Sequence, residues 1–301
     1  MSEEKTSYPN LAQEVQINER EAKIEESGIP ILTLSPSRIK TYQQCPRKYY
    51  HTYVTKLPRK DWAHFHLGTM VHGVLEFFHA EFKKDGCELN LKHLMKEAFQ
   101  KQRETWKKEN IDKDLSMEIL TQARDLLFEY LKRMETSGIG SEIISLEEDF
   151  RIGLGMMCYE PESKLWRILQ DGEMPADNMK TCKVDIRGIV DRIDRDSDGV
   201  MHIRDYKTTK NKKYMEPSQL QSYGIHLLEK YPNIDRFRGS YIMLRHGGEP
   251  ISYDFNLEDI KKERLIILDY AIKITQEERW IMKQSILCDW CDFKDPCLMT
   301  W

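Results

Sequence analysis

Long apolar runs are absent from this 301-residue sequence, and none approaches the ~20 residues that a membrane-spanning helix needs. The N-terminal region has no apolar stretch followed by a cleavage site, so no secretory signal peptide is visible. A Gly-x4-Gly-Lys-Ser/Thr loop, the usual signal of a nucleoside-triphosphate site, is also missing. We therefore expect a cytoplasmic, intracellular protein that relies on a partner for any step driven by ATP.

A large excess of charge of one sign is also lacking. The formal net charge is −4, and it lies in residues 1–28, which hold seven acidic and three basic side chains. The remaining residues balance, with 43 charges of each sign. This balance excludes a uniformly basic surface but leaves room for a local basic cleft. We expect residues 1–30 to form a flexible acidic tail and residues 31–301 to form one domain.

The cysteines are few and unevenly placed. Their number, seven, is odd, and without a secretory signal this favours metal ligation over a disulfide framework. Cys288, Cys291 and Cys297 lie close together near the C-terminal end, and Cys45 is the natural fourth ligand. Four thiolates can hold a structural zinc ion or an iron–sulfur cluster, and the spacing alone does not choose between them. Either group would join the N-terminal and C-terminal parts of the domain.

Apolar periodicity predicts helices in the first half of the chain. Ser35-Pro36 has the form of an N-cap followed by proline in the first turn. Amphipathic patterns then recur with helical spacing, and residues 85–137 form a helical subregion that we interpret as an insertion. We expect helices over residues 36–44, 46–53, 67–83, 91–110 and 115–134.

After Gly140 the pattern changes to strands. The run 183–194 and the run 200–207 flank Arg195-Asp196-Ser197-Asp198-Gly199, a turn signal, so they predict a β-hairpin. Residues 154–182 follow no clear pattern. The alternation of elements predicts an α/β fold with a mixed sheet flanked by helices. We expect further strands over residues 142–152, 238–245 and 250–255, and helices over 216–230 and 256–283.

Two acidic strand positions and a lysine form the candidate catalytic centre. Asp205 and Lys207 share one face of their strand, and pairing across the hairpin can bring Asp191 beside Asp205. Two nearby carboxylates repel each other unless a cation lies between them, and Mg²⁺ or Mn²⁺ prefers such oxygen ligands. Lys207 would then position the attacking water and stabilise negative charge. The alternative is a surface hairpin with a solvated ion pair.

Four segments, in their order along the chain, resemble the RecB branch of the PD-(D/E)XK nuclease superfamily. The segment Gly188–Asp194 resembles its Gly-x-x-Asp-Arg-hydrophobic-Asp strand, and Asp205–Thr208 resembles its Asp-Tyr-Lys-Thr strand. Gly68–His72 is similar to a helix that supplies a further metal ligand, and Gln219–Tyr223 is similar to the Gln-x-x-x-Tyr helix. The resemblance implies a restriction-endonuclease-like core.

The same resemblance implies roles for individual residues. The implied metal ligands are His72, Asp191, Asp205 and the backbone carbonyl of Tyr206, with Lys207 as the third catalytic residue beside the two aspartates. Gln219 and Tyr223 would face DNA, since residues i and i+4 share a helical face. Glu76, one turn beyond His72, is a weaker candidate for contacting the metal or His72.

The cysteine pattern is similar to that of the iron–sulfur members of this branch, which include CRISPR-adaptation nucleases and the AddB nuclease domain. This resemblance implies a 4Fe–4S cluster on Cys45, Cys288, Cys291 and Cys297, with zinc as the alternative.

The resulting functional hypothesis is a Mg²⁺- or Mn²⁺-dependent deoxyribonuclease, an exonuclease on single-stranded DNA or DNA ends in repair, recombination or replication. A helicase or recombination protein is the expected partner. Two alternatives remain: a non-catalytic DNA-end-binding subunit of a recombination or CRISPR-adaptation complex, and a zinc-stapled α/β protein with a purely structural hairpin.

Overall fold

A computed structural model describes residues 29–60, 62–85, 90–106, 113–137, 141–170, 172–176 and 178–298. All but the last two residues of the expected acidic tail lie outside these ranges. Within the described residues, no helix has the length and apolar character needed to cross a membrane.

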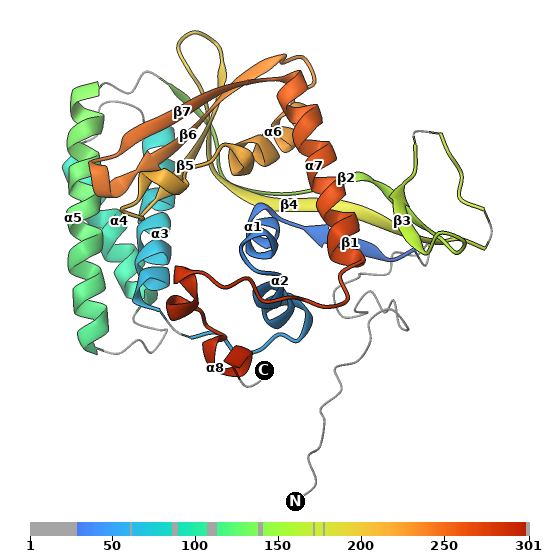
Figure 1. The fold of residues 1–301 in the computed structure, drawn as a ribbon. Helices are drawn as coiled ribbons and strands as arrows, with labels where there is room; N and C mark the ends of the chain where they lie inside the picture. Colours follow the sequence, from blue (N-terminus) through green and yellow to red (C-terminus); the bar gives the residue numbers. More distant parts are fainter. Residues whose placement is uncertain are drawn as a thin grey trace, which may run out of the picture. The chain divides into compact units, whose positions relative to one another are not determined.

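Seven strands form one mixed sheet in the order β3-β2-β4-β5-β6-β7, with β1 paired to β4 (Figure 1). The pairs β1/β4 and β5/β6 are parallel, and the pairs β2/β3, β4/β5 and β6/β7 are antiparallel. The predicted α/β fold with a mixed sheet is therefore confirmed. The strands are β1 (Ile31–Leu34), β2 (Glu142–Glu160), β3 (Leu165–Ile168), β4 (Lys180–Arg195), β5 (Met201–Lys207), β6 (Arg236–Met243) and β7 (Glu249–Asn256).

Most of the helices lie where the apolar periodicity places them. At the start of α1, the Ser35 side chain accepts a hydrogen bond from the Arg38 N–H at 3.2 Å, and Pro36 occupies the first turn, as expected. The longer helices are α1 (Pro36–Gln44), α3 (Ala63–Asp85), α4 (Leu91–Trp106), α5 (Lys113–Ser137), α6 (Ser218–Lys230) and α7 (Leu257–Thr275). The short ones are α2 (Pro46–Tyr49) and α8 (Lys294–Leu298), and a π-helical turn covers Tyr50–Val54.

One expected helix is shorter than predicted, and the structure assigns one stretch that the sequence left open. The last long helix, expected to reach residue 283, ends at Thr275. Beyond that point the Glu277 carboxylate accepts hydrogen bonds from the backbone N–H groups of Arg279 and Trp280, which competes with helical pairing. The unassigned stretch 154–182 contains the end of β2, all of β3 and the start of β4.

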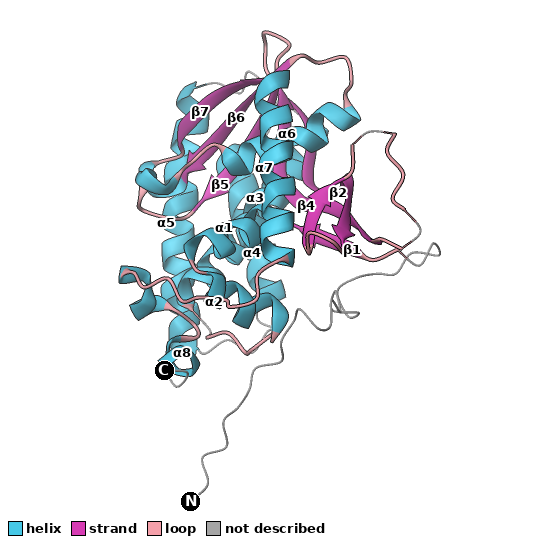
Figure 2. Ribbon diagram, turned by 45° about the vertical axis from the view of Figure 1, so that its right-hand side comes forward, coloured by secondary structure: helices cyan, strands magenta, loops and turns pink. Residues whose placement is uncertain are grey.

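Within the described ranges, the chain forms two compact units built from interleaved segments: residues 29–60, 151–187 and 264–298 in the first, and residues 62–150 and 188–263 in the second. In the second unit α3, α4 and α5 pack together around a buried apolar cluster. Helix α6 of the same unit packs on β5 and β6 (Figure 2). The expectation of one domain over residues 31–301 stays a prediction.

Glu148 ties β2 to α6 in the second unit. Its Oε1 lies 2.5 Å from His226 Nε2 and 2.6 Å from Lys230 Nζ. Burial alone would raise the pKa of Glu148, but the hydrogen bonds from Lys230 and His226 outweigh it and lower the pKa to about 2. Because the pKa is lower in the folded state, this stabilisation is present above the unfolded value near 4.5 and is lost as the pH falls towards 2.

We therefore expect Glu148→Gln to lower the free energy of unfolding at pH 6 more than at pH 3. Urea unfolding at the two pH values measures this difference. Glu142→Gln is the matched control on the same strand, since the Glu142 carboxylate pairs with Arg195 at an exposed position. An equal loss at both pH values would contradict the assignment.

Candidate active site

Acidic and basic side chains from β4, β5 and α3 converge in the second unit. His72 on α3 has Nδ1 3.4 Å from Asp191 Oδ1 and Nε2 3.1 Å from the Tyr206 carbonyl oxygen. The other Asp191 oxygen accepts a hydrogen bond from the Tyr206 N–H at 2.7 Å. The hairpin register pairs Arg192 with Arg204. Asp191 and Asp205 are the next residues along the two strands, so the same register brings them near each other. The structure thus brings together residues from segments that are far apart in the sequence.

Glu147 is the member of this group that the sequence analysis missed. One possible ligand atom from each of His72, Glu147 and Asp191 lies within 4.8 Å of the others. Glu147 has a φ of 43°, in the left-handed region that non-glycine residues rarely adopt. Glu76, the acid that the sequence suggested, is exposed on α3 and does not belong to this three-residue group. No spacing rule distinguishes Glu147 from Glu148, its neighbour in the strand.

The charges of these groups are strongly coupled. Burial raises the pKa of Glu147 to about 7, and the negative charge of Asp191 adds to the shift. Burial likewise raises the pKa of Asp205 to about 6, although Lys207 opposes the shift. For His72, burial acts to lower the pKa, but the hydrogen bond to Asp191 reverses this and raises the pKa to about 9. Carboxyl groups that disfavour one another's charge, beside an imidazole, make a donor set that fits a divalent cation.

Lys207 lies beside Asp205 at the edge of this group. Its Nζ is 2.5 Å from Asp205 Oδ2 and donates a hydrogen bond to Gln219 Oε1 at 3.1 Å. Gln219 Nε2 is 3.0 Å from Asp205 Oδ1 and 2.8 Å from the Tyr223 hydroxyl. Gln219 and Tyr223 therefore share one helical face, and Gln219 fixes the relative positions of the lysine and the carboxylate.

Gly188 is required by the packing next to the site. A Cβ at this position would lie 2.9 Å from the Phe150 ring and 3.0 Å from the Tyr223 ring, closer than side chains tolerate. Tyr223 itself is only 6% exposed, so its hydroxyl reaches the site through Gln219. The glycine at the start of the Gly-x-x-Asp segment thus leaves room for the two rings.

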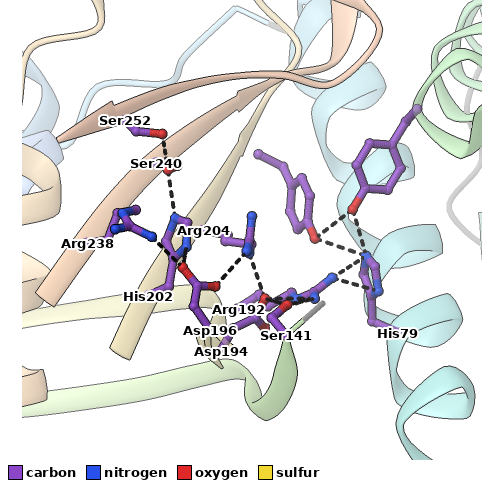
Figure 3. Close-up of polar contacts among 12 residues, drawn as sticks. His79, Ser141, Arg192, Asp194, Asp196, His202, Arg204, Arg238, Ser240 and Ser252 are labelled. Carbon is purple, nitrogen blue, oxygen red and sulfur yellow. Dashed lines mark hydrogen bonds and ion pairs between the residues drawn. The ribbon is translucent and has the colours of Figure 1, made fainter. Parts of the chain in front are cut away.

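A buried charge network continues from the site along the hairpin (Figure 3). Asp194 is fully buried and pairs with Arg192 at 2.6 Å and with Arg204 at 2.6 Å. Arg192 also contacts His79 on α3, whose Nε2 is 2.9 Å from the Tyr206 hydroxyl. The network therefore fixes Tyr206, whose backbone contacts both His72 and Asp191.

A second candidate site lies in the first unit, where a cavity of about 220 Å³ is lined by all four predicted cysteine ligands, Cys45, Cys288, Cys291 and Cys297. The Lys283 N–H lies 3.4 Å from Cys45 Sγ, and the Ser285 N–H lies 3.4 Å from Cys288 Sγ. No disulfide joins any two of the cysteines that the structure describes. Four sulfur atoms around one cavity, with backbone N–H groups near two of them, have the donor chemistry of a thiolate-held metal group. No three of these four sulfur atoms lie within 4.8 Å of one another.

Known proteins resemble this chain in part. Two are subunits of the ATP-dependent helicase/deoxyribonuclease of Clostridium botulinum, from strains Hall and Langeland, each 26% identical over 193 residues. The alignments cover 59% of this chain and 15% of each relative, so the chain spans a small part of their length. The crystal structure of SSO0001 covers 88% of this chain and 96% of its own, at 13% identity, but its TM-score of 0.28 supports no structural argument.

A family model adds a broader match. The model of the PD-(D/E)XK nuclease superfamily matches residues 33–298, a range that contains both candidate sites. The similarity to the two helicase/deoxyribonuclease proteins agrees with the RecB-like resemblance of the sequence motifs. With its mixed sheet and converging acidic residues, the chain belongs to the PD-(D/E)XK nuclease superfamily.

Proposed function

We propose that this protein is a metal-dependent deoxyribonuclease, an exonuclease that hydrolyses single-stranded DNA or DNA ends in repair, recombination or replication. The observation that carries the proposal is the convergence of His72, Glu147 and Asp191 beside the Asp205–Lys207 pair. Membership of a nuclease superfamily supports phosphodiester hydrolysis, and the two similar helicase/deoxyribonuclease proteins support DNA as the substrate.

The proposed metal ligands are His72, Asp191, Asp205 and the Tyr206 carbonyl, and we include Glu147 because it lies in one group with His72 and Asp191. Bound Mg²⁺ or Mn²⁺ would polarise the scissile phosphate and favour ionisation of a water. Lys207 would hold that water and offset negative charge as the phosphate is attacked. Gln219 keeps Lys207 and Asp205 in place, and Tyr223 supports Gln219. We propose that Gln219 and Tyr223 also contact the DNA strand.

The direct test uses single-stranded DNA labelled at either end, with Mn²⁺ and the 301-residue chain purified without oxygen. We expect progressive shortening of linear DNA and no cleavage of circular single-stranded DNA. Asp205→Asn should stop the shortening without unfolding the protein. Divalent-ion-dependent binding to DNA ends with no cleavage would favour the alternative of a non-catalytic end-binding protein.

We further propose that Cys45, Cys288, Cys291 and Cys297 hold a 4Fe–4S cluster with a structural role, with zinc as the alternative occupant. A brown protein with absorption near ~400 nm would support the cluster. The similarity to helicase/deoxyribonuclease proteins also supports a helicase or recombination protein as partner.

Glu147→Gln is expected to weaken Mn²⁺ binding at least about tenfold, or ~1.4 kcal/mol, because it removes one negative oxygen ligand. Isothermal titration calorimetry at pH 8 measures the dissociation constant. Glu76→Gln is the control: it removes an exposed acid from α3 and should leave the constant nearly unchanged. Equal affinities for wild type and Glu147→Gln would remove Glu147 from the metal site.

A further inference from the structure

His51, in the first unit, is a buried polar residue whose side chain has no role in either candidate site described so far. Its side chain is 4% exposed, and neither ring nitrogen has a hydrogen-bond partner in the part of the chain that the structure describes. A buried donor or acceptor without a partner is unfavourable, so each such group calls for an explanation, such as a bound ion, ligand or water.

His51 lines the same cavity as the four cysteines. Its ring packs against the ring of Phe293, with the ring centroids 5.5 Å apart. Phe293 is buried, and in the sequence it lies between Cys291 and Cys297. The C-terminal segment that carries these residues passes beside α1 and α2 before it reaches α8 (Figures 1 and 2). The Lys283 Nζ donates to the Gln43 carbonyl at 3.2 Å and holds this segment in place.

Backbone hydrogen bonds hold the segment around His51, and the two ring nitrogens take no part in them. The residue lies in the π-helical turn Tyr50–Val54, a rare conformation that is frequent at functional sites. The His51 carbonyl accepts a hydrogen bond from the Leu57 N–H at 2.9 Å, and the Tyr50 carbonyl accepts one from the Thr55 N–H at 2.9 Å. The imidazole is therefore held at the cavity without using either of its nitrogens.

The lowered pKa of His51 favours the neutral imidazole, which still has one N–H to donate. Burial lowers its pKa, and the positive charge of Arg47 lowers it further, so the ring carries one N–H near neutral pH. Arg47 and Lys48, which also line the cavity, supply positive charge towards thiolates. A neutral imidazole adds a donor there without adding charge.

We propose that His51 donates its ring N–H to a sulfur atom of the metal group held by Cys45, Cys288, Cys291 and Cys297. The inference rests on the proposed thiolate site and extends it by one side chain. A hydrogen bond to sulfur draws negative charge away from the metal, which favours the reduced state of an iron–sulfur cluster and shifts its reduction potential upward. His51 is thus a positioning and tuning residue, because it acts through the metal-bound sulfur.

The test compares wild type, His51→Phe and His51→Gln, purified without oxygen, by iron, sulfide and zinc content and then by redox titration. We expect all three to bind iron, since the four thiolates remain. The potential of His51→Phe should be more negative than that of wild type, and His51→Gln, whose amide keeps an N–H, should lie between them. Identical potentials in the three proteins would overturn the proposal.

If His51→Phe fails to fold, wild type labelled with ¹⁵N-histidine decides by pulsed paramagnetic resonance of the reduced cluster. A weak nitrogen coupling supports a hydrogen bond to sulfur, whereas a strong coupling shows direct metal ligation and overturns it. If the protein holds zinc, the rate of zinc loss to a chelator replaces the potential, and equal rates overturn the proposal.

A protein that binds neither metal would remove both the thiolate site and the role of His51. The DNA-cleavage assay with Asp205→Asn tests the carboxylate site separately, so failure of the thiolate site and failure of the nuclease proposal remain distinguishable.

Discussion

Lys207→Met is expected to lower the rate of DNA cleavage on the order of 10²–10³-fold, the loss typical when one group that stabilises charge in the transition state is removed. Lys207 lies 2.5 Å from Asp205 and is further held by Gln219, so it is placed beside the proposed metal ligands and not in free solution. Single-turnover cleavage of end-labelled DNA with Mn²⁺ measures the rate of the chemical step.

Lys213→Met is the matched control, because it removes an exposed lysine from the short 3-10 helix Lys212–Tyr214 after β5 and makes the same change of charge. DNA binding, measured by fluorescence anisotropy, should change to a similar extent in the two variants. If Lys207→Met lost its fold, as judged by circular dichroism, Lys207→Arg would keep the charge and still misplace it. Cleavage by folded Lys207→Met at the wild-type rate would contradict the catalytic assignment.

Arg192→Met is expected to lower the free energy of unfolding by about 3 kcal/mol, because removing one member of a buried ion pair leaves its partner insufficiently compensated. Arg192 is 4% exposed, and it pairs with the fully buried Asp194 and contacts His79. Urea unfolding at pH 7 measures the difference. The same variant should also lower nuclease activity, since the network fixes Tyr206 through its hydroxyl.

Arg195→Met, on the same strand, tests whether burial is the cause. Arg195 pairs with Glu142 at 3.3 Å, and both side chains are largely exposed, so we expect a loss below about 1 kcal/mol. Similar losses in the two variants would show that the buried network contributes no more than a surface pair. The contrast is sharp because the two substitutions are chemically identical.

The sequence motifs predicted much of the active site because hairpin geometry is local. Residues i and i+2 share a face, so Asp205 and Lys207 could be placed together before the fold was known. The turn at 195–199 then fixed which residues pair: Arg192 pairs with Arg204, and continuing this register brings Asp191 to Asp205. His72, Gln219 and Tyr223 were found only through the resemblance, since nothing local shows that α3 and α6 approach this hairpin.

The amino-acid sequence by itself predicted most of the helices, the hairpin, the acidic pair with its lysine, and the spacing of the C-terminal cysteines. Only the tertiary structure placed Glu147, whose backbone φ is 43°, in one group with His72 and Asp191, and Glu76 is not a member of that group. It likewise ended α7 at Thr275, where Glu277 accepts a hydrogen bond from Tyr42, 235 positions away in the chain. The position of His51 at the cysteine cavity likewise depends on how the C-terminal segment packs against the N-terminal helices. Such contacts depend on which distant segments pack together, and periodicity along one segment carries no record of that packing.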